Sequence, residues 1–354
     1  MRLLFLTSTP LDIQRGSGTF VGIETLAQAL RAQGATIDIL TPRLRLPVYT
    51  LERILYNETL RLPAAAYDAT IGFDLDGYRL KRDRVPHIAA LKGVIADEAR
   101  FQKGMTKLTM SIQARLEAMH VRRADFVITT SRYAAGRIEQ YYGVRTAAIV
   151  SELIDLARWR EALVANPALP DPRAFTVLSV CRLYRRKRLD LLLEATARLR
   201  DRIPNLRVRI VGSGPEAEEF RAVWRRHRLE AQVAWLGDVS FAELAREYNA
   251  CDLFCLPSMQ EGFGIVFLEA MAAGKPILAA GAAAVPEVVP QGVLVEPGSA
   301  SAIAEAIEAL YRDEKHRAAL AAQGVDRVAQ FDAPRVAAVF LNELRRFVHS
   351  ATTE

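Results

Sequence analysis

Residues 251–279 read CDLFCLPSMQEGFGIVFLEAMAAGKPILA, and this stretch predicts one complete strand–helix–strand unit. Residues 253–256 form a short apolar run, residues 264–273 have the length and spacing of a helix, and residues 276–279 form a second apolar run. A helix that joins two such strands through short loops is the repeating unit of a parallel sheet. The stretch therefore favours an α/β fold.

The same alternation of strands and helices occurs on both sides of one proline-rich segment. Residues 165–173 (ANPALPDPR) contain three prolines in nine positions, which suits a linker better than a helix or a strand. We therefore predict one domain over residues 1–164, a second over 174–333 and a last helix over 334–354. Both domains are expected to be Rossmann-like, doubly wound units, whose ligands bind at the carboxyl ends of the strands. With two such domains facing each other, we expect the site in the cleft between them.

The composition excludes several classes of protein. The chain has 354 residues, of which 51% are hydrophobic and 25% charged, and a formal net charge of +6. These values exclude a mostly disordered chain, a collagen-like chain and a disulfide scaffold. Arginines are 40 of the 47 basic residues, a mild indication of partners that carry phosphate. No nucleic-acid-binding motif accompanies this charge, so we expect no nucleic acid partner.

Compartment and metal content are predicted from what the sequence lacks. The three cysteines, Cys181, Cys251 and Cys255, lie in apolar stretches, which indicates a reducing compartment. The N-terminal apolar run is too short for a signal peptide, and no run approaches the roughly 20 residues of a membrane span. The five histidines are scattered, so no metal site is predicted. We expect a cytoplasmic protein without a metal.

The most informative segment for chemistry is residues 261–269, EGFGIVFLE. Gly262 and Gly264 allow the backbone to lie close to a ligand, and the amides at the start of the following helix form an anion site. Glu261 and Glu269 flank that helix start and are suited to bind hydroxyl groups. A phosphate between two hydroxyl-binding carboxylates matches a nucleotide sugar. The alternative is a helix that carries acidic residues near its N-terminus, where negative charge is stabilising.

A basic segment follows the strand predicted over residues 175–180. Residues 182–188 (RLYRRKR) contain five cations in seven positions. Arg182 and Lys187 could hold a diphosphate while the leaving group gains charge. The other three arginines are interpreted as a solvated basic loop.

Two further strand ends carry glycine turns. Gly212 and Gly214 could lie near the nucleotide, but a lone GxG is a weak signal, and a tight turn before a proline-initiated helix is the favoured interpretation. Leu236, in the sequence Trp-Leu-Gly, could offer its backbone to a nucleobase. A simple turn is an equal alternative there.

The N-terminal half offers weaker candidates. Gly16 and Gly18 lie in an early glycine loop, which we expect to be flexible and close to the donor nucleotide. Asp74 and Asp76 follow a predicted strand and could bind a divalent metal or acceptor hydroxyls, although a turn with aspartate side chains is favoured. Lys92 follows another strand and could contact a phosphate or a hydroxyl, or lie at the surface.

Residues 176–298 resemble the C-terminal half of the retaining GT-B glycosyltransferases of family 4. The segments that carry the resemblance are CRLYRRKRLDLLLEA, VRIVGSGPE, VAWLGDV, the stretch over residues 251–279, VPEVV and GVLVEPGS. The N-terminal half matches more loosely, through its glycine loop and RRADFVITTSRYAAGRIEQYYGV. The resemblance implies a GT-B fold, with an acceptor-binding N-terminal domain and a nucleotide-sugar-binding C-terminal domain. It also implies that the last helix, from about Pro334, returns to the N-terminal domain.

The resemblance implies a role for each candidate residue. Glu261 would bind the donor sugar's hydroxyls, and Glu269 the ribose of the nucleotide. Arg182 and Lys187 would neutralise the diphosphate without a metal or cofactor, since the nucleotide sugar is a co-substrate. The backbone amides implied to touch sugar or phosphate are those of Gly262, Phe263, Gly264, Ile265 and Val266. The implied reaction is front-face displacement onto a saccharide, a lipid-linked or a small-molecule hydroxyl, with the departing phosphate helping to deprotonate the acceptor.

Two segments depart from the family pattern. Lys92 stands where many members carry a histidine, which points to a different donor or an acidic sugar. Residues 151–155 (SELID) replace the usual proline-asparagine-glycine turn, which points to unusual acceptor chemistry.

The sequence does not exclude two other functions and one further partner, a membrane. The first function is a sugar-nucleotide 2-epimerase, which shares the GT-B fold and would convert its donor without an acceptor. The second is a non-catalytic module that binds a nucleotide sugar. Arg43, Arg45, Arg53 and Arg61 accompany apolar residues, a pattern that predicts either peripheral docking on an anionic membrane or a solvated helix flank.

Overall fold

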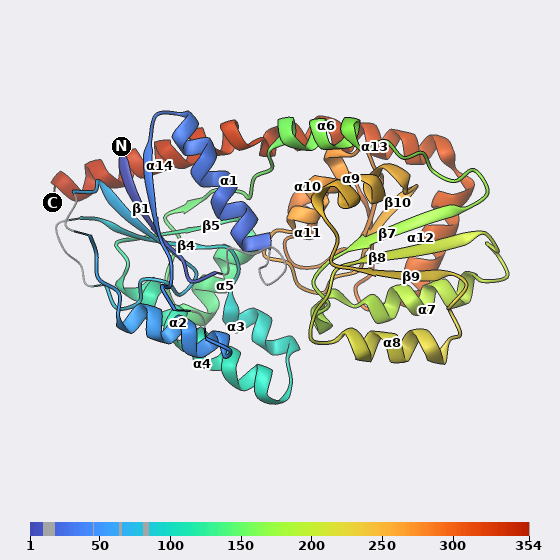
Figure 1. The fold of residues 1–354 in the computed structure, drawn as a ribbon, viewed down its shortest axis with the longest axis horizontal. Helices are drawn as coiled ribbons and strands as arrows, with labels where there is room; N and C mark the ends of the chain where they lie inside the picture. The colour runs from blue at the N-terminus through green and yellow to red at the C-terminus, as the bar shows by residue number, and fades with distance from the viewer. Residues whose placement is uncertain (10–17, 45, 64–65, 81–84, 354) are drawn as a thin grey trace. The chain divides into compact units, whose positions relative to one another are not determined.

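The computed structural model describes residues 1–9, 18–44, 46–63, 66–80 and 85–353 (Figure 1). The chain forms two compact units: unit 1 contains Met1–Leu153 and Asp332–Glu354, and unit 2 contains Ile154–Phe331. Each unit has a six-stranded parallel sheet with helices packed against it, which confirms the predicted α/β class. Among the described residues, no helix has the length and apolar character needed to span a membrane.

The sheet of unit 1 has the strand order β2-β1-β3-β4-β5-β6, with every neighbouring pair parallel. Its strands are β1 (Arg2–Leu6), β2 (Thr36–Leu40), β3 (Ala69–Phe73), β4 (His87–Leu91), β5 (Phe126–Thr129) and β6 (Ala148–Ile149). β3 and β4 are buried along their whole length because helices cover both faces of the sheet. The order changes direction between β1 and β3, so the segments that follow these two strands lie next to each other.

The helices of unit 1 include the C-terminal helix, which packs on α1 as the sequence predicted. They are α1 (Gly18–Ala32), α2 (Tyr49–Glu58), α3 (Ile95–Glu98), η1 (Ala99–Phe101), α4 (Gly104–Arg123), α5 (Arg132–Tyr142) and α14 (Ala333–Thr353). Ser131 caps α5 by accepting a hydrogen bond from the amide of Ala134 at 3.0 Å, and Gly143 ends it with φ of +68°. Val336, Phe340 and Leu344 of α14 belong to the hydrophobic core of the unit.

The sheet of unit 2 has the order β12-β11-β10-β7-β8-β9, again with all pairs parallel. Its strands are β7 (Phe175–Val180), β8 (Leu206–Val211), β9 (Val233–Gly237), β10 (Leu253–Leu256), β11 (Ile277–Ala280) and β12 (Val293–Val295). The order changes direction between β7 and β10. The loops that follow these two strands are therefore neighbours at one end of the sheet, where ligands of doubly wound folds bind.

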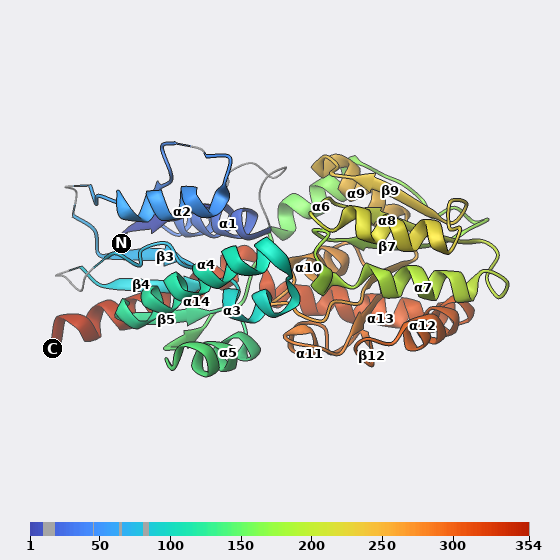
Figure 2. The same cartoon turned by 90° about the horizontal axis from the view of Figure 1, so that it is seen from below.

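The helices of unit 2 cover both faces of its sheet, and Figure 2 shows α7 and α12 side by side on one of them. The helices are α6 (Leu156–Ala165), η2 (Arg185–Lys187), α7 (Leu189–Leu199), α8 (Ala217–Arg226), α9 (Phe241–Ala250), α10 (Ile265–Ala272), α11 (Val285–Val288), α12 (Ala300–Arg312), α13 (Glu314–Val328) and η3 (Ala329–Phe331). The three cysteines are buried and carry free thiols.

The boundary between the units differs from the prediction. The sequence placed residues 154–164 in the N-terminal domain, but α6 packs on α9 of unit 2. The Trp159 ring contacts the rings of Phe241 and Tyr248 edge to face, at centroid distances of 4.9 and 5.6 Å. Buried aromatic rings contribute a large apolar area, so this contact fixes α6 to unit 2. The boundary lies at Leu153 and Ile154, and the proline-rich segment runs within unit 2.

Candidate functional site

An ion pair joins the loops after β7 and β10. Lys187 lies in η2 after β7, Glu261 lies between β10 and α10, and the Lys187 Nζ donates a hydrogen bond to Glu261 Oε1 at 2.5 Å. The two side chains are only 11% and 7% exposed. The backbone also links these loops, since the Met259 amide donates to the Arg186 carbonyl at 2.8 Å. Two residues 74 positions apart are thus brought together at the point where the strand order reverses.

The charge of Glu261 follows from its surroundings. Burial alone raises the pKa of Glu261, but the ammonium of Lys187 and the guanidinium of Arg186 outweigh it and hold this pKa below the ordinary value. Glu261 is therefore a carboxylate whose free lone pairs accept hydrogen bonds. It is suited to bind hydroxyl groups and poorly suited to donate a proton.

Arg182 is held by a polar chain from two neighbouring loops. Its Nη1 donates to Ser213 Oγ at 2.8 Å, and this hydroxyl donates to Asp238 Oδ2 at 2.6 Å. Its side chain is 30% exposed. The guanidinium is thus oriented by the protein but still has donors that face solvent, which is what binding an anion requires.

The neighbouring arginines have local partners. Arg185 pairs with Glu219 at 2.6 Å, and Arg188 pairs with Asp190 at 2.9 Å. The guanidinium of Arg186 lies over the ring of Tyr184, 4.9 Å from its centroid. These three arginines are therefore part of the loop's own structure, and Arg182 and Lys187 remain the two candidates for binding an anion.

Gly212 and Gly214 are required by close backbone packing. A Cβ on Gly212, which has φ of +117°, would lie 2.0 Å from the Cys181 carbonyl oxygen, and a Cβ on Gly214 would lie 2.6 Å from the Leu183 amide nitrogen. The Gly212 amide donates to the Gly237 carbonyl at 2.7 Å. The structure thus favours the turn over the nucleotide contact at Gly212, because its amide is already used. Leu236 is half-buried against the core of unit 2.

The start of α10 presents backbone donors. Gly264 precedes the helix with φ of +96°, and a Cβ there would lie 2.6 Å from the Phe267 ring. The amides of Ile265 and Val266 open the helix and have no acceptor within it. Phe263 is buried against Phe331, with ring centroids 5.5 Å apart, so its ring anchors the loop. Gly262 and Phe263 can approach a ligand only through their backbone.

Glu269 has a partner that sequence reasoning missed. The buried Tyr248 donates its hydroxyl to Glu269 Oε2 at 2.9 Å and comes from α9, 21 positions earlier. Burial raises the pKa of Glu269 to about 7. The carboxyl of Glu269 therefore changes between its neutral and charged forms near neutral pH.

Asp76 is an internal residue of unit 1, which corrects the possibility of a ligand contact that the sequence left open beside the favoured turn. It is 0% exposed and accepts hydrogen bonds from the Ser8 amide at 2.6 Å and the Asn57 side chain at 2.9 Å. Arg53, itself buried, lies 3.5 Å away as its counter-charge. A ligand cannot reach this carboxylate. The same contact removes Arg53 from the basic surface that the sequence predicted, and Arg45 lies outside the described residues.

Asp74 and Lys92 lie together at the ends of β3 and β4. Asp74 has φ of +54°, and its Oδ1 accepts a hydrogen bond from the Lys92 amide at 3.0 Å. Burial raises the pKa of Asp74 to about 6. The Lys92 Nζ donates to Glu152 Oε2 at 2.8 Å, and both side chains are nearly buried. The two departures from the family pattern therefore meet in one ion pair.

A buried chain of hydrogen bonds fixes the Asp74 backbone. His120 Nδ1 donates to the Asp74 carbonyl at 2.5 Å, because a carbonyl can only accept. His120 Nε2 must then accept from His87 Nε2 at 2.8 Å, and His87 Nδ1 must accept from the Thr70 hydroxyl at 2.8 Å. Burial lowers the pKa of His120 to about 4 and that of His87 well below its ordinary value. Both rings are neutral and each has a single allowed tautomer.

Gly18 is the first residue of α1, and Gly16 lies outside the described residues. In the part of the chain that the structure describes, no three histidine, cysteine, aspartate or glutamate side chains are grouped to hold a metal ion.

Comparison with known proteins gives a consistent result. Residues 165–327 match the family model described as glycosyl transferases group 1. A relative from Mycobacterium tuberculosis, named GDP-mannose-dependent alpha-(1-6)-phosphatidylinositol monomannoside mannosyltransferase, is 31% identical over 62% of this chain and 62% of its own. The chain spans between 39% and 62% of the length of the first curated relatives that it matches.

Solved structures match over nearly the whole chain. Sucrose-phosphate synthase from Thermosynechococcus elongatus is 21% identical, with a TM-score of 0.78 over 99% of both chains. The HepE protein of Anabaena, solved in complex with UDP and glucose, is 20% identical, with a TM-score of 0.71 over 98% of this chain and 100% of that one. These likenesses confirm the GT-B fold class that the sequence predicted.

Proposed function

We propose that the protein is a retaining glycosyltransferase that moves a sugar from a nucleotide-diphosphate sugar to an acceptor hydroxyl. The observation that carries the proposal is the Lys187–Glu261 pair, which places a cation and a hydroxyl-binding carboxylate side by side beside the start of α10. The family match over residues 165–327 supports it. The names of the relatives add that the mycobacterial protein depends on GDP-mannose and that the Anabaena structure contains UDP and glucose.

The donor is proposed to bind at the switch point of unit 2. Glu261 accepts hydrogen bonds from the sugar's hydroxyls, and Glu269, held by Tyr248, binds those of the ribose. Lys187, Arg182 and the amides that open α10 neutralise the diphosphate. These groups supply the positive charge that a metal supplies elsewhere, so the proposal includes no metal or cofactor. Unit 1 is proposed to bind the acceptor.

The proposed reaction breaks the bond between the anomeric carbon and the β-phosphate oxygen. The electron pair of that bond goes to the leaving diphosphate, and the sugar passes through an oxocarbenium-like state. The acceptor oxygen attacks from the same face, and its proton passes to the leaving phosphate oxygen. The catalytic contribution of Arg182 and Lys187 is to stabilise the charge that grows on the diphosphate.

Turnover with a panel of nucleotide sugars tests the proposal. With UDP-glucose and GDP-mannose as donors, Glu261→Gln should lower kcat about 100-fold or more, the usual effect of removing one group that stabilises a transition state. Arg185→Ala, which removes a surface ion pair of the same loop, should leave kcat unchanged. NMR of donor incubated alone identifies an epimerase, because the epimer has the same mass as the donor and only an epimerase forms it without an acceptor. Nucleotide-sugar binding without any turnover would favour the non-catalytic module.

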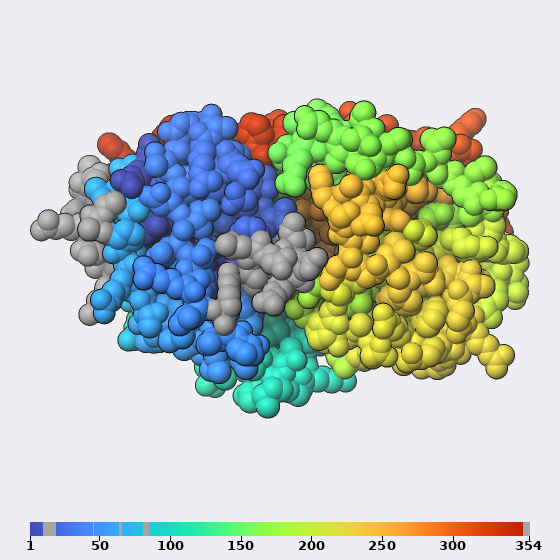
Figure 3. Space-filling view, in the orientation of Figure 1, coloured from blue at the N-terminus to red at the C-terminus, as the bar shows by residue number. Residues whose placement is uncertain are grey.

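We further propose that unit 1 docks on an anionic membrane through α2, α4 and the segment before α2. Two helices of this docking patch are joined by a hydrogen bond from Gln113 Nε2 to Thr50 Oγ1 at 2.9 Å. Figure 3 shows the blue surface of α2 and the teal surface of the start of α4 on the same side of unit 1. The exposed apolar residues of the patch are Leu44, Leu46, Val48, Tyr49, Leu51, Leu55, Met105, Leu108 and Ile112. Exposed Arg43, Lys103 and Lys107 flank them.

Vesicle co-sedimentation tests the docking patch. Vesicles with about a third of anionic phosphatidylglycerol should bind the protein more strongly at low than at high salt, since charge attraction is screened by ions. The double variant Leu51→Ser with Leu55→Ser should reduce binding, and Val164→Ser, an exposed apolar residue of unit 2, should not. Equal sedimentation with neutral and anionic vesicles would contradict the proposal.

A further inference from the structure

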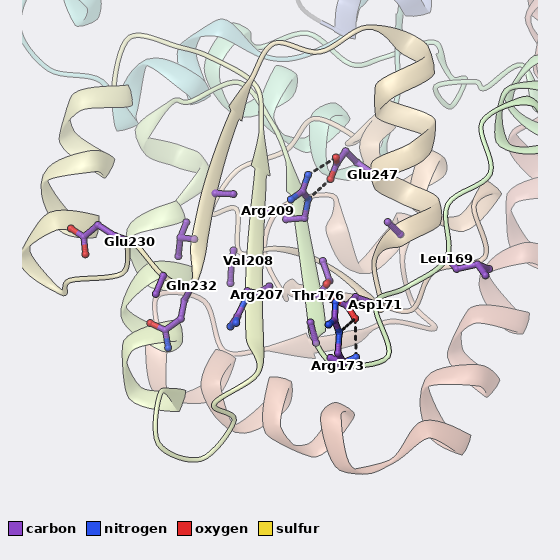
Figure 4. A pocket seen from close by; sticks show the side chains of 15 residues that line it. Leu169, Asp171, Arg173, Thr176, Arg207, Val208, Arg209, Glu230, Gln232 and Glu247 are labelled. Atoms are coloured by element: carbon purple, nitrogen blue, oxygen red, sulfur yellow. Dashed lines mark hydrogen bonds and ion pairs between the residues drawn. The ribbon is translucent and has the colours of Figure 1, made fainter.

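A hollow lies in unit 2, away from the candidate donor site. Its volume is about 670 Å³, within the range of ligand-binding pockets. It is open on one side to solvent and is bordered by residues 169–174, by the beginnings of β7, β8 and β9, and by α9 (Figure 4). Its polar lining residues include Thr176, Arg207, Arg209, Glu230 and Glu247.

This hollow and the candidate donor site lie at opposite ends of the sheet. Thr176 is at the beginning of β7, whereas Arg182 follows the carboxyl end of the same strand. Because a strand rises about 3.3 Å per residue, roughly 20 Å separate the two sites. A ligand in the hollow would therefore not contact the nucleotide sugar.

The sheet face in the hollow is polar, unlike the covered faces of a parallel sheet. Strand register places Thr176 beside Arg207, and Arg209 beside Ala234. Arg209 forms a two-pronged pair with Glu247 of α9, with N–O distances of 2.5 and 2.7 Å. Figure 4 looks onto this face, with the Arg209–Glu247 pair at one border of the hollow. Buried strands in such folds are normally apolar, so this row of side chains is suited to a polar ligand.

Two side chains in the hollow have unused hydrogen-bonding capacity. Thr176 is 6% exposed, and its hydroxyl has no hydrogen-bond partner among the described residues. The Arg207 Nη1 donates to its neighbour's carbonyl, that of Leu206, at 2.9 Å. A guanidinium has five N–H groups, so several donors of Arg207 are available to a ligand.

The charge of the lining selects the class of ligand. The lining carries three guanidiniums and three carboxylates, those of Arg173, Arg207, Arg209, Asp171, Glu230 and Glu247. Arg209 pairs with Glu247, and Arg173 pairs with Asp171. A phosphate would meet the carboxylates, and an amine would meet the guanidiniums, so neither charge is favoured. A neutral ligand rich in hydroxyls suits this lining, because each hydroxyl both donates and accepts a hydrogen bond. The small side chains of Ala174, Ala231 and Ala234 leave room for a sugar ring.

We propose that this hollow binds a neutral oligosaccharide of two or three sugar units. The site is non-catalytic and separate from the donor site. It goes beyond the proposed function, because it retains a glycan on unit 2 whatever the donor is. Its size and its balanced pairs of donors and acceptors are the features that recognise the ligand.

Binding of maltotriose and mannotriose to the full chain tests the proposal. Titration calorimetry and saturation-transfer NMR should show saturable binding of at least one trisaccharide, equal with and without saturating UDP. Arg207→Ala and Thr176→Val should each weaken binding, Arg207→Ala by about tenfold or more, as expected for a hydrogen bond to a charged group. Arg198→Ala, which removes an exposed arginine of α7, should have no effect.

The outcomes separate this proposal from the proposed function. Failure of both trisaccharides to bind saturably, binding unaffected by Arg207→Ala and Thr176→Val, or displacement by UDP would overturn the oligosaccharide site. Tighter binding of inorganic phosphate than of either trisaccharide would also overturn it. Nucleotide-sugar turnover is measured separately and should be unchanged in Arg207→Ala, so either proposal can fail while the other stands.

Discussion

Replacing Lys187 by methionine removes one charge from the buried Lys187–Glu261 pair and leaves Glu261 without its hydrogen-bonded counter-charge, with only the guanidinium of Arg186 acting on it. The two side chains are 11% and 7% exposed, so water cannot solvate the carboxylate that remains. Breaking a buried pair in this way costs about 3–5 kcal/mol of unfolding free energy. Unit 2 runs from residue 154 to residue 331, or 178 residues. For that size 1 kcal/mol shifts the melting temperature by about 2–4 °C, so Lys187→Met should lower it by roughly 6–20 °C.

The loss of stability in Lys187→Met should depend on pH. In the wild type the pKa of Glu261 lies below its ordinary value of 4.5, so its charge stabilises the fold above that value and this stability is lost in acid. Without Lys187, burial prevails and raises this pKa, so the charged form destabilises the variant. The stability difference between wild type and variant should therefore widen as the pH rises from about 4.5 to 7.5.

Urea unfolding of four proteins at pH 5 and pH 7.5 measures both effects. The proteins are the wild type, Lys187→Met, Glu261→Gln and the double variant, which should recover much of the loss because it leaves no buried charge. Glu218→Gln, which breaks an exposed pair with Arg221, should not change the unfolding midpoint. A Lys187→Met protein as stable as the wild type at both pH values, or strictly additive effects in the double variant, would refute the reasoning.

Three further predictions concern packing, protonation and the interior of unit 1. Gly212→Ala should destabilise unit 2 by well over 1 kcal/mol, because its Cβ would lie 2.0 Å from a carbonyl oxygen. Gly136→Ala in α5 is the control: its Cβ meets no atom within 4 Å, so it should stabilise unit 1 by about 0.5–1 kcal/mol. Thermal melting compares the two variants with the wild type. The pKa of Glu269 is about 7 in the fold against an ordinary 4.5, so stability should fall as the pH rises from 5 to 7, and Glu269→Gln should abolish this part of the change in urea midpoints. Asp76→Ala should cost about 3–5 kcal/mol of stability in urea and leave the calorimetric Kd for the nucleotide sugar unchanged; weaker binding at unchanged stability would contradict its internal role.

The fold of unit 2 was predictable because its signals are local. Apolar runs bounded by glycine and proline predict β7, β10 and β11 to within a residue or two. The unit boundary was mistaken because nothing near Trp159 shows that its partners are Phe241 and Tyr248, more than 80 residues later. Contacts between distant segments have no local pattern.

The residues of the candidate site were likewise predictable where the signal is local and not predictable where it depends on distant contacts. Strand order in a doubly wound sheet places the segments of Lys187 and Glu261 together, and each segment was identifiable from its own residues. A ligand contact was left open for Asp76 because an aspartate after a strand has the same local pattern whether it faces solvent or an interior arginine. Its burial depends on Ser8 and Arg53, which come from other elements of the unit.

The chain from Thr70 through His87 and His120 to the Asp74 carbonyl has a consequence for proton movement. It resembles a proton wire, but its last acceptor is a peptide oxygen, which cannot pass a proton on. A proton added to His120 Nε2 would turn this acceptor into a donor and set it against the N–H of His87, whereas a proton added to His87 Nδ1 would face the Thr70 hydroxyl, whose oxygen can accept. The chain of hydrogen bonds therefore blocks proton transfer through the interior of unit 1. His87 and His120, the two residues of this unit that most resemble a general acid and base, do not act as such.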